Sequence, residues 1–129
     1  MKSIDIRLYV SDFDNSIDFY AEVLGFELKA HCSTNATVTL NDRSLLLCKS
    51  WWPEKIFAQP VEYPFGRGSQ FRFEVIDLEK IKANLAKHSI KYLQPPRTWE
   101  DASIKVGKCH QIEIADPDGY VLTFYQWTS

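Results

Sequence analysis

Apolar and polar residues alternate strictly over residues 4–10, where every second residue is Ile, Leu or Val. A period of two predicts a β-strand with one face on a core and the other face polar. The polar positions of this strand are Asp5, Arg7 and Tyr9. These three side chains are therefore predicted to point away from the core.

A helix is predicted to follow this strand. Asp12 and Asp14 are candidate N-cap residues for it. Apolar residues then recur at helical spacing up to Leu24, and Gly25 occupies the position of a C′ glycine. Three short strands are expected to complete the first half, at residues 28–32, 36–40 and 45–49. The first half of the chain thus has the predicted order βαβββ.

The opening pattern returns at residues 69–77, which align with residues 4–12 so that Arg72 matches Arg7. A second helix is predicted to begin after Asp77, with a buried stripe formed by Leu78, Ile81 and Leu85. Further strands are predicted at residues 90–93 and 111–115 and from residue 120 onward. The chain is therefore interpreted as an internal duplication of a βαβββ module.

A β-hairpin is predicted to close the second module. Two apolar runs with a period of two flank the turn at residues 116–119. Pro117 presets φ at the second turn position, and Gly119 can adopt the positive φ that such a turn requires. One domain is expected, with a first module at residues 1–50, an aromatic and proline-containing linker at 51–67 and a second module at 68–129.

Composition restricts the possible partners and the cellular location. The 129 residues are 45% hydrophobic and 14% aromatic and carry a formal net charge of −2. Without a basic patch we expect neither a nucleic-acid nor a membrane partner, and without a signal peptide or an apolar span we expect a cytoplasmic protein. Cys32, Cys48 and Cys109 form no CxxC motif, so reduced thiols are expected.

Besides the paired modules, the sequence contains two motifs, VSDFDNSIDFYAEVLGFEL and IADPDGYVLTFYQ. With these features the chain resembles the vicinal oxygen chelate superfamily of glyoxalase I, extradiol dioxygenases and bleomycin resistance proteins. The resemblance implies an α+β fold in which two βαβββ modules form a curled mixed sheet around a cleft. In metal-using members the first and last strands of each module contribute ligands. The matching positions here are Asp5, Cys48 (with Leu47 as the neighbouring candidate), Gln70 and Thr123.

These four positions are a poor donor set for a divalent metal, because none is a histidine and a thiolate would join otherwise hard ligands. We therefore expect no metal and no cofactor. His31, His88 and His110 lie elsewhere in the sequence. His88 is expected to complement the negative C-terminal end of its helix.

The resemblance implies that the polar residues of the two first strands line the cleft. Those residues are Asp5, Arg7, Tyr9, Gln70, Arg72 and Glu74. Arg7 and Arg72 could clamp an anion, or they could neutralise Asp5 and Glu74 across the sheet. Trp51, Trp52 and Trp99 could stack on a flat ligand, or they could be buried or seal a dimer interface. Phe57, Phe65 and Trp127 are weaker candidates.

The preferred hypothesis is a metal-independent binding protein, like the bleomycin-resistance branch, that sequesters a planar or anionic small molecule such as an antibiotic or secondary metabolite. The resemblance also implies a homodimer. One alternative is a divergent metal-dependent lyase, isomerase or dioxygenase using Asp5, Gln70 and Glu113, and another is a module for dimerisation or regulation. No hydrolase, dinucleotide-binding, P-loop or zinc-protease motif occurs.

Overall fold

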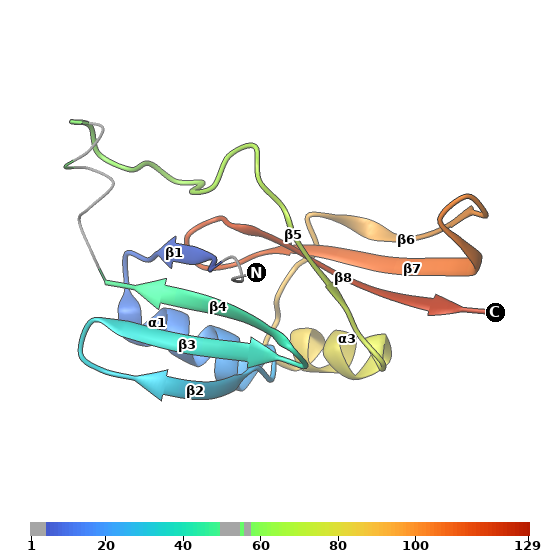
Figure 1. Ribbon diagram of the computed structural model, residues 1–129, viewed down its shortest axis with the longest axis horizontal. Helices are drawn as coiled ribbons and strands as arrows, with labels where there is room; N and C mark the ends of the chain where they lie inside the picture. The colour runs from blue at the N-terminus through green and yellow to red at the C-terminus, as the bar shows by residue number, and fades with distance from the viewer. Residues whose placement is uncertain (1–4, 50–54, 56–57) are drawn as a thin grey trace. The chain divides into compact units, whose positions relative to one another are not determined.

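A computed structural model describes residues 5–49, 55 and 58–129, and Figure 1 shows its helices and strands. The chain forms two compact units. One contains residues up to Phe65 together with Pro117–Gly119, and the other contains Gly66–Asp116 and Tyr120–Ser129. The turn of the predicted closing hairpin therefore packs with the first unit, although its two strands belong to the second.

The first unit has the predicted βαβββ order, with a short π-helical segment, η1, directly after the helix. Its elements are β1 (Arg7–Tyr9), α1 (Phe13–Asp18), η1 (Phe19–Val23), β2 (Glu27–His31), β3 (Asn35–Leu40) and β4 (Arg43–Cys48). The strands form a four-stranded sheet in the order β1-β4-β3-β2. Strand β1 runs parallel to β4, and the other neighbours are antiparallel.

Local signals in the sequence account for the ends of the first helix. The Asp12 carboxylate accepts a hydrogen bond of 3.1 Å from the backbone N–H of Asn15, which confirms Asp12 as the N-cap. Gly25 follows the helical segment with φ at +80°, as predicted for a C′ glycine. Together, Leu8, Val38 and Leu47 form part of the buried core of this unit.

The second unit repeats this architecture. Its elements are β5 (Phe71–Glu74), α3 (Leu78–Lys87), β6 (Gln94–Asp101), β7 (Lys105–Ala115) and β8 (Val121–Thr128). The sheet order is β5-β8-β7-β6, with β5 parallel to β8, so each strand occupies the same place as its counterpart in the first unit. The observed α+β fold confirms the predicted fold class for both halves of the chain.

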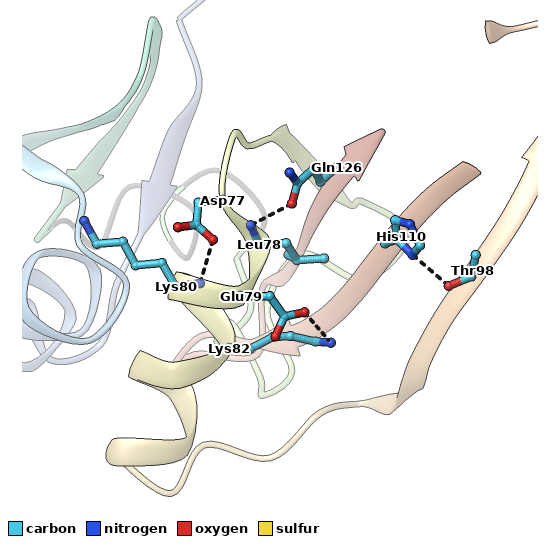
Figure 2. A network of polar contacts seen from close by, with 8 residues as sticks. All are labelled: Asp77, Leu78, Glu79, Lys80, Lys82, Thr98, His110 and Gln126. Carbon is cyan, nitrogen blue, oxygen red and sulfur yellow. Dashed lines mark hydrogen bonds and ion pairs between the residues drawn. The ribbon is translucent and has the colours of Figure 1, made fainter. Parts of the chain in front are cut away.

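Side chains from two directions cap the start of α3, as Figure 2 shows. Asp77 accepts a hydrogen bond of 3.1 Å from the N–H of Lys80, as predicted for the N-cap. Gln126 on β8 accepts a 3.0 Å bond from the N–H of Leu78 and donates a 2.6 Å bond to the carbonyl of Ile76. Gln126 therefore points to the side of the second sheet on which α3 lies.

One predicted strand is wrong. Residues 90–93 form no strand, and the strand before β7 is β6, which includes Pro95 and Pro96. Proline cannot donate to a β-ladder, but an edge strand or a bulge tolerates it. Both conditions hold here, because β6 is the edge of its sheet and its register shifts between Gln94 and Arg97.

The closing hairpin has the predicted turn. The Asp116 carboxylate accepts a hydrogen bond of 2.9 Å from the N–H of Tyr120, and Gly119 adopts a φ of +91°. Asp118 accepts bonds from the N–H of Ser11 at 3.1 Å and from its hydroxyl at 2.5 Å. Through this pair of residues, the two motifs on which the family resemblance depends touch each other directly.

Within the described part of the chain, no helix combines the length and the apolar character needed to cross a membrane.

Candidate functional site

The second sheet presents a polar face on the side away from α3. Side chains alternate along a strand, so Thr123, Tyr125 and Trp127 point opposite to Gln126, which caps α3. The pairing register extends this face over the neighbouring strands. We call it the polar face of the second sheet, and its main members are Gln70, Arg72, Glu74, Trp99, Gln111, Glu113, Thr123, Tyr125 and Trp127.

Arg72 lies over an aromatic ring on this face. Its guanidinium carbon is 4.6 Å from the centroid of the Tyr125 ring. Residues two apart on one strand lie ~7 Å from each other, so Trp127 is the next side chain along β8 on the same face. A cationic group and aromatic surface are therefore adjacent on the polar face of the second sheet.

Trp127 pairs with Trp99 in an edge-to-face arrangement. The two ring centroids are 5.3 Å apart and the planes are inclined at 74°. The Lys105 ammonium lies 5.8 Å from the Trp127 ring centroid. Cys109 lies opposite both tryptophans in the strand register. It is fully buried, and burial raises the pKa of its thiol. The two indoles thus form an aromatic wall beside a thiol that stays protonated at neutral pH.

Glu113 is the centre of a polar network on the same face. It accepts hydrogen bonds from the side-chain amides of Gln94 at 2.7 Å and Gln111 at 3.1 Å. The Arg97 guanidinium lies 3.6 Å from the same carboxylate oxygen. Gln111 in turn accepts a 2.8 Å bond from the indole N–H of Trp99. A chain of directed hydrogen bonds therefore connects Glu113 to the aromatic wall.

Two of the predicted metal positions satisfy each other. The side-chain amide of Gln70 donates a 2.5 Å hydrogen bond to the hydroxyl of Thr123. Thr123 is fully buried, so this bond gives its hydroxyl oxygen a hydrogen-bond partner within the protein.

The equivalent face of the first sheet carries the predicted residues of β1. Arg7 and Tyr9 pair with Leu46 and Cys48 of β4. A hydrogen bond to the Tyr9 side chain raises the pKa of Arg7, and the nearby Cys48 and Asp5 raise it further. Asp5, Arg7, Tyr9 and Cys48 are therefore brought together on one face of the first unit.

The predicted match between Cys48 and Thr123 is wrong by two residues. Arg7 lies opposite Leu46, whereas its counterpart Arg72 lies opposite Thr123. Leu46 is therefore the structural equivalent of Thr123, and neither Cys48 nor Leu47 is. Cys48 is 2% exposed, and burial raises the pKa of its thiol, which favours the neutral form.

These corrected positions do not fit the metal that some members of the resembled superfamily use. The side chain of Leu46 has no donor atom, and the side chains of Gln70 and Thr123 bond to each other. Among the described residues, no group of three or more His, Cys, Asp or Glu side chains is placed to hold a metal ion. We derive no chemical step through a metal.

The histidines lie away from both polar faces. The His31 ring is 5.8 Å from that of Phe13, against the helix of the first unit. His88 Nδ1 is 2.9 Å from the Asn84 carbonyl in the last turn of α3, which confirms its predicted position at the helix end. His110 lies on the α3 side of its sheet, with Nδ1 2.9 Å from the Thr98 hydroxyl, as Figure 2 shows. Its Nε2 is 2.8 Å from the Thr128 hydroxyl.

Some predicted site residues cannot be placed, and others were missed. Trp51, Trp52 and Phe57 fall outside the described residues. Gln111 was missed, although it shares the parity of Glu113 in an alternating strand, and that parity could have identified it. Arg97 could not have been found, because the strand that carries it was predicted in the wrong place.

Comparison with known proteins agrees with this architecture. The sequence profile of the Glyoxalase/Bleomycin resistance protein/Dioxygenase superfamily matches residues 4–124. No curated protein matches the sequence at a significant level.

Solved structures share the fold at low sequence identity. A glyoxalase/bleomycin resistance protein/dioxygenase from Alicyclobacillus acidocaldarius aligns with a TM-score of 0.73 and 14% identity over 99% of this chain and 92% of its own. A protein of unknown function from Agrobacterium tumefaciens aligns with a TM-score of 0.75 and 18% identity, over 99% of this chain and 95% of its own. A lactoylglutathione lyase from the same organism aligns with a TM-score of 0.67 and 19% identity, over 97% of this chain and 92% of its own. At such identities the likeness extends to the fold alone.

Proposed function

Because this chain belongs to the glyoxalase/bleomycin resistance protein/dioxygenase superfamily, we propose that it is a metal-independent binding protein that sequesters a planar, anionic small molecule. An antibiotic or a secondary metabolite with an acidic group on an aromatic system would have this chemistry. The proposal assigns binding alone to the protein and no chemical step.

The observation that carries the proposal is the position of Arg72 over Tyr125, next to the aromatic wall of Trp99 and Trp127. A guanidinium that stacks on a ring keeps its N–H donors at the edges of its plane, where a carboxylate or sulfonate can accept two of them. The neighbouring indoles offer rigid apolar surface for the flat part of the same molecule. Charge and stacking would then act on one ligand.

The donor set supports binding without a metal. Three of the expected metal positions offer no free ligand, because the side chain of Leu46 is apolar and those of Gln70 and Thr123 bond to each other. The prediction that Trp51 and Trp52 add further stacking surface stays a prediction, and so do the homodimer and the cytoplasmic location. Light scattering of the purified protein would test the homodimer.

Calorimetric titration with aromatic carboxylates and sulfonates, compared with neutral aromatic amides of the same size, tests the proposal. We expect binding of the anions and a loss of about ten- to a hundredfold in affinity on Arg72→Gln, since a hydrogen bond to a charged group contributes about 1.5–3 kcal/mol. Arg43→Gln is the matched control, because Arg43 is an exposed arginine at the start of β4 in the first unit. Equal affinity of the wild type and Arg72→Gln for every anion would contradict the proposal.

A further inference from the structure

We propose that Gln111 is a positioning residue that fixes the orientation of Trp99, and so shapes the aromatic wall that the ligand meets. The inference rests on the proposed function for the role of the wall. Gln111 is 2% exposed, and both ends of its amide are bonded, the oxygen to Trp99 and the nitrogen to Glu113. Gln111 itself touches no ligand in this proposal.

The hydrogen-bond chain can run in only one direction. An indole N–H can only donate, and an ionised carboxylate can only accept. Gln111 stands between the two, so its oxygen must face Trp99 and its nitrogen must face Glu113. Glu113 is held in turn by Gln94 and Arg97. The orientation of the Trp99 ring is therefore set from the interior of the sheet.

The backbone around Trp99 offers less constraint. Strand β6 is the edge of its sheet, and its register shifts both before Arg97 and after Trp99. Besides its hydrogen bond to Gln111, the Trp99 ring makes an edge-to-face contact with Trp127, and an edge-to-face contact fixes no hydrogen-bond direction. A residue on an irregular edge strand needs a side-chain anchor if its ring is to be held rigidly.

The same two hydrogen bonds would be expected if Gln111 only stabilised the fold, because a buried amide needs partners. The test therefore needs a readout other than stability. Two indoles at this separation and inclination couple electronically, and their exciton couplet in circular dichroism reports the angle between them. The second readout is the affinity for naphthalene sulfonate, an aromatic anion.

Gln111→Met keeps the length of the side chain and removes both hydrogen bonds. We expect it to abolish or invert the couplet and to weaken naphthalene sulfonate binding about fivefold to tenfold, the value of about one hydrogen bond. Gln126→Met is the matched control, because Gln126 also makes two hydrogen bonds through its amide but on the α3 side of the sheet. It should lower the melting temperature while leaving the couplet and the affinity intact.

The double variant Gln111→Glu/Glu113→Gln tests the direction of the chain. The indole would then donate to a carboxylate, and the amide nitrogen at position 113 could donate to that carboxylate and, once the Gln94 amide turns over, to the oxygen of Gln94. We expect this variant to recover the couplet and most of the affinity. If Gln111→Met fails to fold, the couplet and the affinity of this double variant still test the proposal.

The outcomes separate the two proposals. If Gln111→Met leaves the couplet and affinity unchanged, the positioning role is overturned while the binding function stands. If the wild type binds no aromatic anion, the proposed function is overturned, and the couplet of Gln111→Met compared with Gln126→Met alone decides whether Gln111 positions Trp99. Loss of the couplet in both variants would reduce Gln111 to a structural role.

Discussion

Gln70 donates a hydrogen bond of 2.5 Å to Thr123, and this bond joins an exposed amide to a fully buried hydroxyl. By the family resemblance both residues stand where metal-using relatives place ligands. Here the two side chains satisfy each other, so the polar face of the second sheet is organised by contacts within the protein. The asymmetry in burial makes the pair testable, because only one partner would be left without water when the other is removed.

Gln70→Ala should therefore cost more stability than Thr123→Val. The first leaves a buried hydroxyl without a partner, at about 1–3 kcal/mol, whereas the second frees an exposed amide that water can bond. We expect the cost of Thr123→Val to stay below about 1 kcal/mol. Urea unfolding of both variants measures the difference, and the opposite order would mean that the hydroxyl has another partner.

Metal ions should not stabilise the protein. The donor positions include Leu46, and Gln70 and Thr123 are bonded to each other. We expect the melting temperature of chelator-treated protein to be the same with and without Zn, Ni, Mn or Fe(II). A metal at a hundred times its dissociation constant would raise the free energy of unfolding by about 2.7 kcal/mol, which raises the melting temperature of a domain of this size by roughly ten degrees. A rise of that size with any one metal would contradict the metal-independent proposal.

Local patterns predicted much of the fold. Alternation identified β1 and β5, and short-range capping chemistry identified Asp12, Asp77 and the position of His88. These features depend on residues within a few positions of each other, so a single sequence contains them. The repeat of one pattern then predicted the second unit from the first.

Long-range pairing explains what could not be predicted. β4 contains three consecutive leucines, so no alternation fixes its register, and Leu46 rather than Cys48 lies opposite Arg7. β6 contains two prolines, which exclude a regular strand, and only its position at the sheet edge makes the strand possible. The residues of the polar face of the second sheet were therefore predicted in part: Arg72, Trp99 and Glu113 were among those named, whereas Gln111, Arg97 and Tyr125 were not.

Asp118→Ala should destabilise the protein by about 2–3 kcal/mol. Asp118 is 3% exposed and accepts hydrogen bonds from the N–H and the hydroxyl of Ser11. Bonds to a charged group contribute more than neutral ones, and this substitution removes both of them at once. Ser11→Ala removes only the hydroxyl bond and should cost about 1 kcal/mol. Chemical unfolding tests the order, and equal costs would mean that the backbone bond contributes nothing.

Cys32 should be alkylated before the other two cysteines. It is exposed, and the backbone N–H of Thr34, followed by the side chain of Thr34 and by Asn35, lowers its pKa. Cys48 and Cys109 are buried, and burial raises the pKa of each thiol. Because the thiolate is the nucleophile, iodoacetamide should label Cys32 first, at a pH below that needed for an ordinary thiol.

Peptide mass spectrometry after short exposures to iodoacetamide follows this order. Cys32→Ser is the control, and the folded variant should take up no rapid label. Early labelling of Cys48 or Cys109 in the wild type would contradict the prediction, because it would show that these buried thiols reach solvent as readily as Cys32.

Gly119→Ala should be among the most damaging small substitutions in the chain. Gly119 has a φ of +91°, and a Cβ there would lie 2.7 Å from the Pro64 Cα and 2.5 Å from its Cβ. The backbone of Pro64 cannot rotate away as a flexible side chain would, so the turn or the Pro64 segment must shift. We expect a loss of about 3 kcal/mol or more.

Gly25→Ala separates the clash from the backbone strain. Gly25 has a similar φ of +80°, but a Cβ added there would meet nothing within 4 Å. Only the left-handed conformation is then penalised, at about 1–2 kcal/mol. Urea unfolding of the two variants should give a clearly larger loss for Gly119→Ala. Equal losses would show that the Pro64 segment yields freely, and that the contact between it and the hairpin turn adds little to the stability of the first unit.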